Sequence, residues 1–178
     1  MSNYLRSTGT LGAVTQRSGD PIAEATRQWR EHGWVDAAPG MAAITSLMRA
    51  HQIALARAEG ALKPHGITFA RYEVLMLLEF SSRGSLPMSV IGSRLQVHPT
   101  SVTNAVDRLE SAGLVRREPH PSDRRATLVA ITDEGREVAR VATTDLNTTV
   151  FADPGLAPHD VATITEVLER YRREAGDF

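Results

Sequence analysis

The sequence predicts a mainly α-helical protein with one small β-hairpin. Three observations support this prediction. Two short helical stretches joined by a tight turn occupy residues 88–112, and two strand-like stretches follow directly at 114–118 and 126–131. Longer amphipathic helical patterns flank this region on both sides, at 41–65 and 132–150. Two helices followed by a β-hairpin is the order of parts in a winged helix-turn-helix.

The N-terminal part predicts a tail and two helices. Residues 1–20 are rich in Ser, Thr and Gly without a periodic face, so we expect a flexible tail. Asp20-Pro21 favours the start of a short helix over 21–33, and 34–40 forms a connector. A long helix is expected over 41–65, where many alanines permit close helix approach. Its apolar stripe comprises Ile44, Leu47, Met48, Leu55 and Leu62.

The next segment predicts one more helix before the central pair. Thr68 is a candidate N-cap for a helix that ends at Phe80. Residues 86–88 could form a short edge strand beside the hairpin. The side chains that we expect this helix to bury are Phe69, Tyr72, Leu75, Met76 and Leu78.

The two central helices are separated by residues 96–98. Ser89 is a candidate cap for the first helix, and Pro99 starts the second at the position where its missing N–H costs nothing. Val102, Val106 and Leu109 recur at helical spacing and predict a buried stripe. Gly113 is expected to end the helix in a left-handed conformation.

The opposite face of the second helix is polar. Short hydroxyl and amide side chains at the start of a helix let its backbone enter a DNA major groove and contact base edges. An ordinary amphipathic hairpin with a solvated polar face has the same pattern, and this helix alone does not distinguish the two. The face comprises Thr100, Ser101, Thr103, Asn104, Asp107 and Arg108.

A basic loop lies between the two strands. Its prolines make a stiff turn, and Arg124 and Arg125 stand beside Asp123 at the tip. An Arg that a neighbouring carboxylate orients suits the narrow, electronegative minor groove of A·T-rich DNA. Two arginines on a hairpin are otherwise an ordinary solvated tip, but their place after the polar helix favours DNA binding.

Five stretches in this order resemble the multiple-antibiotic-resistance-regulator (MarR) family of bacterial winged-helix transcription factors. They are 100–104 (TSVTN), 107–110 (DRLE), 113–117 (GLVRR), 123–125 (DRR) and 128–135 (LVAITDEG). The resemblance covers about residues 44–171 and implies a homodimer that binds a pseudo-palindromic operator. One recognition helix per subunit would enter the major groove, with the wings in the flanking minor grooves. It also implies regulation by a small ligand bound between the dimerisation helices and the DNA-binding lobe.

The resemblance assigns roles to individual residues. Arg125 is the expected minor-groove arginine, with Arg124 as the alternative and Asp123 as its brace. Arg108 would contact phosphate or tie the recognition helix to the wing, and the sequence leaves both open. Arg71, near a helix start, is a further candidate phosphate contact. The other expected DNA contacts are Ser89, Pro99, Thr100, Ser101, Thr103 and Asn104.

Composition limits the classes of function. The net charge is −1, although residues 71–130 hold eight Arg against six acidic residues. The absence of cysteine excludes disulfides, thiolate zinc sites and thiol catalysis, and the six histidines lack close ligand spacing, so no metal or cofactor is expected. Without a signal peptide or a long apolar run, the expected location is the cytoplasm, with no membrane partner.

The expected organisation has four parts. These are a tail (1–20), an N-terminal extension with a dimerisation helix (21–65), a DNA-binding lobe (66–132) and C-terminal dimerisation helices (133–178). The first and last helices have more apolar surface than one lobe can cover, which favours subunit pairing. In the last helix, over 158–174, this surface comprises Val161, Ile164, Val167, Leu168 and Tyr171.

The effector is an unidentified small molecule. The N-terminal extension with Trp29 and Trp34 is similar in part to that of the urate-responsive branch of the family, and Glu73 could supply the acidic residue of that branch. The branch's recognition-helix arginine is missing, since Ala105 follows Asn104. Alternatively, both tryptophans only pack the extension onto the dimer. The candidate pocket for an aromatic or carboxylate-bearing effector comprises Trp29, Trp34, His51, Arg57, Tyr72, Glu73 and Met76.

Two other classes of function fit this sequence less well. A hydrolase needs a nucleophile in a strand-turn-helix context, and no Ser or Thr of this sequence lies in one. Paired carboxylates for glycoside hydrolysis are not distinguishable from the acidic residues of solvated helix faces. We therefore expect no enzymatic activity. A winged helix used only for protein contacts has no reason to carry the Asp-Arg-Arg tip beside a Ser/Thr-rich helix.

Overall fold

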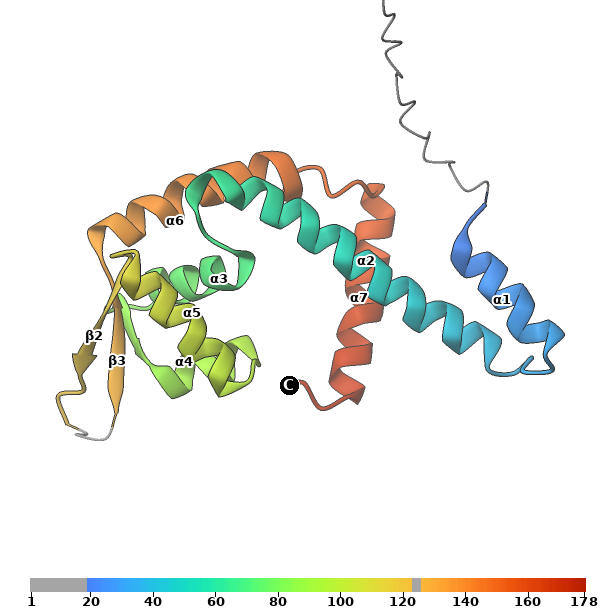
Figure 1. Ribbon diagram of the computed structural model, residues 1–178, viewed down its shortest axis with the longest axis horizontal. Coiled ribbons are helices and arrows are strands. Elements are labelled where there is room, and N and C mark those ends of the chain that lie inside the picture. Colours follow the sequence, from blue (N-terminus) through green and yellow to red (C-terminus); the bar gives the residue numbers. More distant parts are fainter. Residues whose placement is uncertain (1–18, 123–125) are drawn as a thin grey trace, which may run out of the picture. The chain divides into compact units, whose positions relative to one another are not determined.

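The computed structural model describes residues 19–122 and 126–178. The chain divides into two units, one up to Gln52 and one from Ile53 onward. The predicted tail, except for its last two residues, lies outside the described residues. Figure 1 shows the elements in chain order, with α2 continuing from the first unit into the second.

The first unit holds α1 (Pro21–Glu31) and the start of α2 (Ala38–Leu62). As predicted, Asp20 begins α1, and its side chain accepts a hydrogen bond from the Ile22 N–H at 3.0 Å. The rings of Trp29 and Trp34 pack edge to face, with centroids 5.1 Å apart. Helix α2 starts three residues before the predicted Met41, because a proline at position 39 is compatible with a first helical turn, where N–H groups have no intrahelical acceptor.

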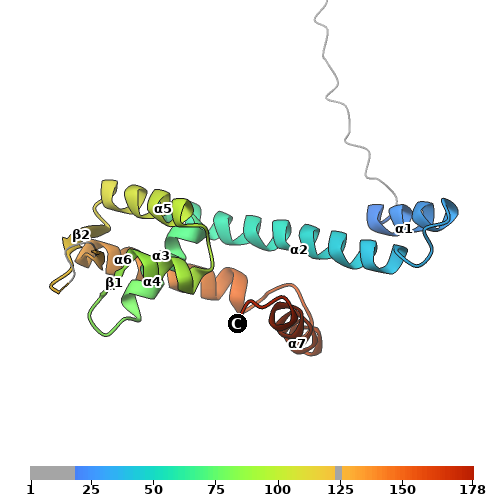
Figure 2. The ribbon, with the colours of Figure 1, turned by 90° about the horizontal axis from the view of Figure 1, so that it is seen from below.

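The second unit contains the remaining elements. After α2, a 3₁₀ turn η1 (Lys63–His65) leads to α3 (Phe69–Glu79), which Thr68 caps as predicted. Figure 2 shows α5 along one side of the lobe that α3, α4 and the strands form. The other elements are β1 (Ser85–Pro87), α4 (Met88–Leu95), α5 (Pro99–Ser111), β2 (Val115–Pro119), β3 (Thr127–Ile131), α6 (Asp133–Leu146), the π-helical η2 (Asn147–Phe151) and α7 (Pro158–Glu174).

The three strands form an antiparallel sheet in the order β1-β3-β2. Leu86 of β1 is opposite Val129, and Arg116 of β2 is opposite Ala130. The predicted edge strand is therefore present, one residue earlier than expected. Pro87 lies on this edge strand, which is where a sheet tolerates a residue without an N–H. The mainly α-helical fold with a small β-wing is confirmed.

The core of the second unit lies between α3, α5, the sheet and α6. Val102, Val106 and Leu109 of α5 are at most 2% exposed, which confirms the predicted stripe. Phe69 and Met76 are only half-buried at the edge of the core, so their predicted burial is wrong in part, whereas the unpredicted Val74 is buried. Val74 is buried because α3 packs on α4, α5 and α6, and a one-sided stripe does not anticipate that.

Hydrogen bonds connect the start of α6 to the end of α5. The Thr132 hydroxyl accepts from the Gly135 N–H at 3.0 Å and donates to the Gly113 carbonyl at 2.8 Å. Gly113 has the predicted left-handed conformation, with φ of 74°. A Cβ at Gly135 would overlap the carbonyl oxygen of Leu114, so this position requires a glycine.

Helix α7 exposes apolar side chains. Val161, Ile164, Val167 and Tyr171 are 38% to 51% exposed, although their spacing is that of a buried stripe. Ile44, Met48 and Leu55 of α2 are exposed as well. These stripes are therefore not covered by the core of the single chain.

Candidate nucleic-acid interface

A tight turn sets the start of α5. Gln96, between α4 and α5, has a left-handed backbone with φ of 53°, and Pro99 is the first residue of α5 as predicted. The His98 side chain caps the helix by accepting the Thr100 N–H at 3.3 Å. Ser89 does not cap α4, so that prediction is wrong: β1 runs directly into the helix through Pro87, and Ser89 lies exposed in the first turn.

The predicted polar face of α5 is exposed in full. Thr103 donates its hydroxyl to the Pro99 carbonyl at 3.0 Å, so its oxygen remains an acceptor. Within residues 19–122 and 126–178, the side chains of Thr100, Ser101 and Asn104 have no hydrogen-bond partner. These groups are therefore free to bind an external partner.

Arg117 of β2 ties the wing to α5. Its guanidinium contacts the carboxylate of Asp107 at 2.5 Å and also that of Glu110, while Glu110 accepts the Arg117 backbone N–H at 3.0 Å. Burial alone would lower the pKa of Arg117, but the hydrogen bonds to Asp107 and Glu110 raise it above its ordinary value. The sequence suggested Arg108 for this contact and did not indicate Arg117. The available signal was Glu110, which lies one helical turn after Asp107 and shortly before the wing.

Several cations of the lobe have no acidic partner among residues 19–122 and 126–178. Arg108 is exposed, and no ion pair involves it in the part of the chain that the structure describes. By contrast, Arg116 pairs with Glu118 at 2.6 Å, and Arg136 pairs with Glu79. Unneutralised guanidinium groups suit contacts to phosphate. Besides Arg108, the described cations of this kind are Arg71, Arg83 and Arg94 in the lobe and Lys63 just before it.

The stem of the wing is an antiparallel pair of strands. The His120 N–H donates to the Ala126 carbonyl at 3.2 Å, which continues the pairing of β2 and β3 toward the tip. The Ser122 N–H donates to the His120 Nδ1 at 3.3 Å. Asp123, Arg124 and Arg125, the predicted tip residues, lie outside the described residues.

Five of the seven residues predicted for an effector pocket make contacts within the described part of the chain. The Tyr72 hydroxyl lies 3.0 Å from the Thr143 hydroxyl, and Met76 Sδ accepts from Thr143 at 3.4 Å. Arg57 is bound to backbone carbonyls near α7. In the first unit, Trp29 and Trp34 contact each other, and His51 is exposed on α2.

Glu73 is half-buried on α3, and burial raises the pKa of its carboxyl. The folded state therefore holds this proton more tightly than the unfolded chain does. The resulting stability is fully present below the unfolded pKa, about 4.3, and is lost as the pH rises through the folded value.

We expect Glu73→Gln to raise the melting temperature at neutral pH and to leave it nearly unchanged near pH 4. Thermal-shift measurements across this range check the prediction. Glu166→Gln, at an exposed position on α7, serves as the control. An equal response of the two variants would show that burial does not perturb Glu73.

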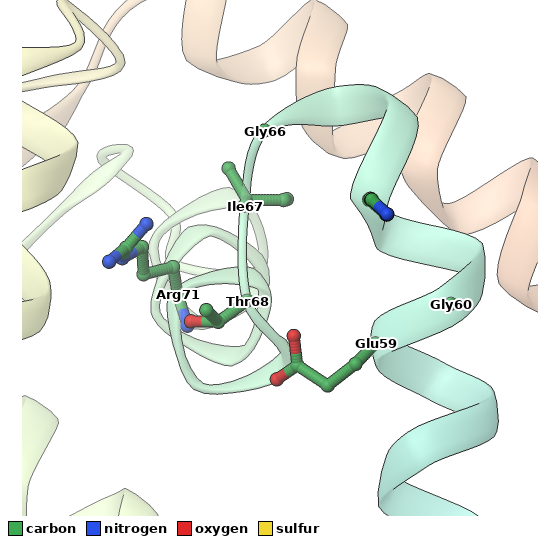
Figure 3. A pocket seen from close by; sticks show the side chains of 7 residues that line it. Glu59, Gly60, Gly66, Ile67, Thr68 and Arg71 are labelled. Atoms are coloured by element: carbon green, nitrogen blue, oxygen red, sulfur yellow. The ribbon is translucent and has the colours of Figure 1, made fainter.

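One hollow of about 400 Å³ lies between the end of α2 and the start of α3. In Figure 3 the Glu59 carboxylate points toward the first turn of α3, where it accepts the Phe69 N–H at 2.9 Å, and Arg71 extends away from it. The hollow shares no residue with the predicted pocket. Its lining comprises Glu59, Gly60, Lys63, Gly66, Ile67, Thr68 and Arg71.

Comparison with known proteins finds close relatives of this fold. Sco5413, a MarR family transcriptional regulator from Streptomyces coelicolor, is 53% identical, and the match covers 79% of this chain and 97% of that one with a TM-score of 0.72. Sco3205 from the same organism, solved in complex with DNA, is 27% identical, with coverages of 74% and 85% and a TM-score of 0.65.

Sequence comparison agrees with these likenesses. The HTH-type transcriptional regulator MhqR of Bacillus subtilis is 30% identical over 123 residues, which are 64% of this chain and 78% of MhqR. Other curated relatives match over a shorter stretch, and the chain spans about half of their length, between 47% and 53%. A sequence profile of the MarR family matches residues 67–127.

The paired helices, the polar α5 and the strand pair define a winged helix-turn-helix protein. The identities to MhqR and Sco5413, over most of the length of each, place it more closely: the chain belongs to the MarR family of transcriptional regulators. No helix among the described residues is long and apolar enough to cross a membrane.

Proposed function

We propose that this protein is a ligand-responsive repressor that binds a pseudo-palindromic operator as a homodimer. In this proposal α5 of each subunit enters a major groove, and a wing arginine enters the adjacent minor groove. The protein acts by binding rather than by catalysis, in the cytoplasm where the operator lies. Its effector is a small molecule that has not been identified.

The observation that carries the proposal is the exposed and unpartnered polar face at the start of α5. Thr100, Ser101 and Asn104 present donors and acceptors that no described side chain satisfies. Arg108 adds a guanidinium to the same face, so base and phosphate contacts can form together. The solved relative Sco3205 binds DNA with the same fold.

The exposed apolar face of α7 supports the homodimer. Four large apolar side chains on one helix would cost free energy if water surrounded them, at about 25 cal/mol per Å² of apolar surface. Pairing with a second copy removes this cost, and two-fold symmetry then sets two lobes on successive turns of the duplex.

A mobility-shift titration with the DNA upstream of the gene that encodes this chain tests the proposal. Binding through several phosphates releases counterions, so the affinity should fall steeply between low and moderate salt. A mutated half-site should weaken binding of the dimer. Affinity that ignores both salt and half-site sequence would contradict operator recognition.

Arg125→Ala should weaken operator binding by about 1–3 kcal/mol and reduce the preference for A·T pairs at the operator flanks. Arg124→Ala is the matched comparison, because the two guanidinium groups are neighbours on the predicted tip. Binding to flank-randomised duplexes measures both effects. Wild-type affinity and flank preference in both variants would remove the wing from the proposed mechanism.

A further inference from the structure

The guanidinium of Arg57 donates hydrogen bonds to three backbone carbonyl groups of a segment that lies 92 to 97 residues further along the chain. It donates to the carbonyl oxygens of Pro154 at 2.7 Å, Asp153 at 2.6 Å and Thr149 at 3.3 Å. These carbonyls belong to η2 and to the connection between η2 and α7. Arg57 therefore joins α2 to the segment that leads into α7.

The segment around these carbonyls is shaped to receive the arginine. Helix α6 continues into the π-helical η2. Such helices are rare in proteins, occur mostly as single turns and are frequent at functional sites. The chain then turns at Asp153, whose carboxylate accepts the Gly155 N–H at 3.1 Å. Gly155 has φ of 76°, and a Cβ there would lie 3.3 Å from Nη1 of Arg57.

A cation at this place has a physical reason. The Thr149 carbonyl lies near the end of η2, where carbonyl groups lack intrahelical donors and carry the negative end of the helix dipole. The carbonyls of Asp153 and Pro154 follow in the connection after η2. A planar guanidinium can donate to several of them in fixed directions, which an ammonium group cannot do with the same geometry. The contacts thus hold α2 against the last turn of η2 and against the start of the connection that leads into α7.

We propose that Arg57 is a positioning residue that sets the spacing of the two DNA-binding lobes by fixing the direction of α7. This inference rests on the proposed homodimer, in which α7 contributes its exposed apolar face to subunit pairing. Two linked lobes gain affinity only when their separation matches that of the half-sites. A change in the direction of α7 would leave each lobe intact and alter this match.

The experiment uses full-length protein and a duplex that the wild type recovers from a random-sequence pool. From this duplex we derive a set in which the half-site spacing changes by one or two base pairs, and one in which a half-site is scrambled. The variants are Arg57→Gln, Arg57→Lys and Gly155→Ala, which disturbs the same junction from the other side. Arg49→Gln is the control, since Arg49 lies on α2 and contacts only the Gln52 side chain among the described residues.

We expect Arg57→Gln and Gly155→Ala to reduce the discrimination between the selected spacing and altered spacings by about tenfold. Affinity for the duplex with one intact half-site should stay within about twofold of the wild type, because the lobe itself is unchanged. Arg57→Lys should fall between Arg57→Gln and the wild type, and Arg49→Gln should match the wild type. Sedimentation should show that all four variants remain dimers.

Three results would overturn the inference. An equal loss on the intact and the half-scrambled duplexes would mean that Arg57 supports the lobe, and a monomeric Arg57→Gln would mean that it holds the subunits together. An unchanged spacing profile in Arg57→Gln would remove its positioning role. If instead the wild type itself shows no preference for two half-sites, the proposed function fails and not this inference.

Discussion

Ser101→Glu is expected to weaken operator binding by about a hundredfold, or about 2.7 kcal/mol, without loss of folding stability. Ser101 is exposed at the third position of α5, on the face that we propose enters the major groove. A carboxylate there would face the acceptor-rich groove and the phosphates. At the start of a helix, the same carboxylate favours folding through the helix dipole, by about 0.3–1 kcal/mol.

Ser101→Glu should thus lower the affinity for DNA while it slightly raises the folding stability, and these opposite effects distinguish a lost DNA contact from a damaged fold. Anisotropy titrations measure the affinity, and thermal melts measure the stability of the same preparation. Thr144→Glu is the control, because it adds the same charge at an exposed position on α6. Equal losses of affinity in both variants would mean that only the added negative charge matters and not its position. Undiminished binding by Ser101→Glu would mean that another surface faces the groove.

Gly135→Ala is expected to destabilise the fold by about 3 kcal/mol, which lowers the melting temperature by about 6 to 12 °C. A Cβ at this position would overlap the carbonyl oxygen of Leu114, which is backbone and cannot rotate away. The same carbonyl accepts the Thr132 N–H at 3.1 Å, so its displacement would also break the link between the end of α5 and the start of α6.

Gly60→Ala separates this overlap from the general effect of removing a glycine. Gly60 lies inside α2, and a Cβ there would meet nothing within 4 Å. In a helix interior alanine is favoured over glycine by up to about 1 kcal/mol, so this variant should melt slightly higher than the wild type. Similar melting temperatures for the two alanine variants would contradict the close approach at Gly135.

The sequence predicted the elements of the lobe because their signals are local. Helical spacing of Val102, Val106 and Leu109 identifies the buried side of α5, and Thr68, Pro99 and Gly113 mark helix ends through their own backbone chemistry. The exposed side of α5 follows directly from this stripe. Because the buried stripe identifies the opposite side of the helix, the polar candidate residues of α5 could be predicted from the sequence.

Contacts between distant segments could not be predicted in this way. The tie of Arg117 to Asp107 and Glu110, and the contacts of Arg57 with carbonyls near α7, depend on how elements pack. Sequence reasoning named Arg57 only as a candidate for an effector pocket, which stays a prediction, and gave no sign of its carbonyl contacts. Ser89 was assigned as a cap because a short edge strand that feeds directly into a helix has a weak local signal.

The bonds from Arg117 to both acidic residues of α5 have a consequence for induction. They connect α5, the proposed recognition helix, to β2 at the base of the hairpin, so that the two elements should move together. In the proposed function, a ligand that releases α5 from the duplex should therefore release the hairpin as well, in one step and without an intermediate in which only one of the two stays bound.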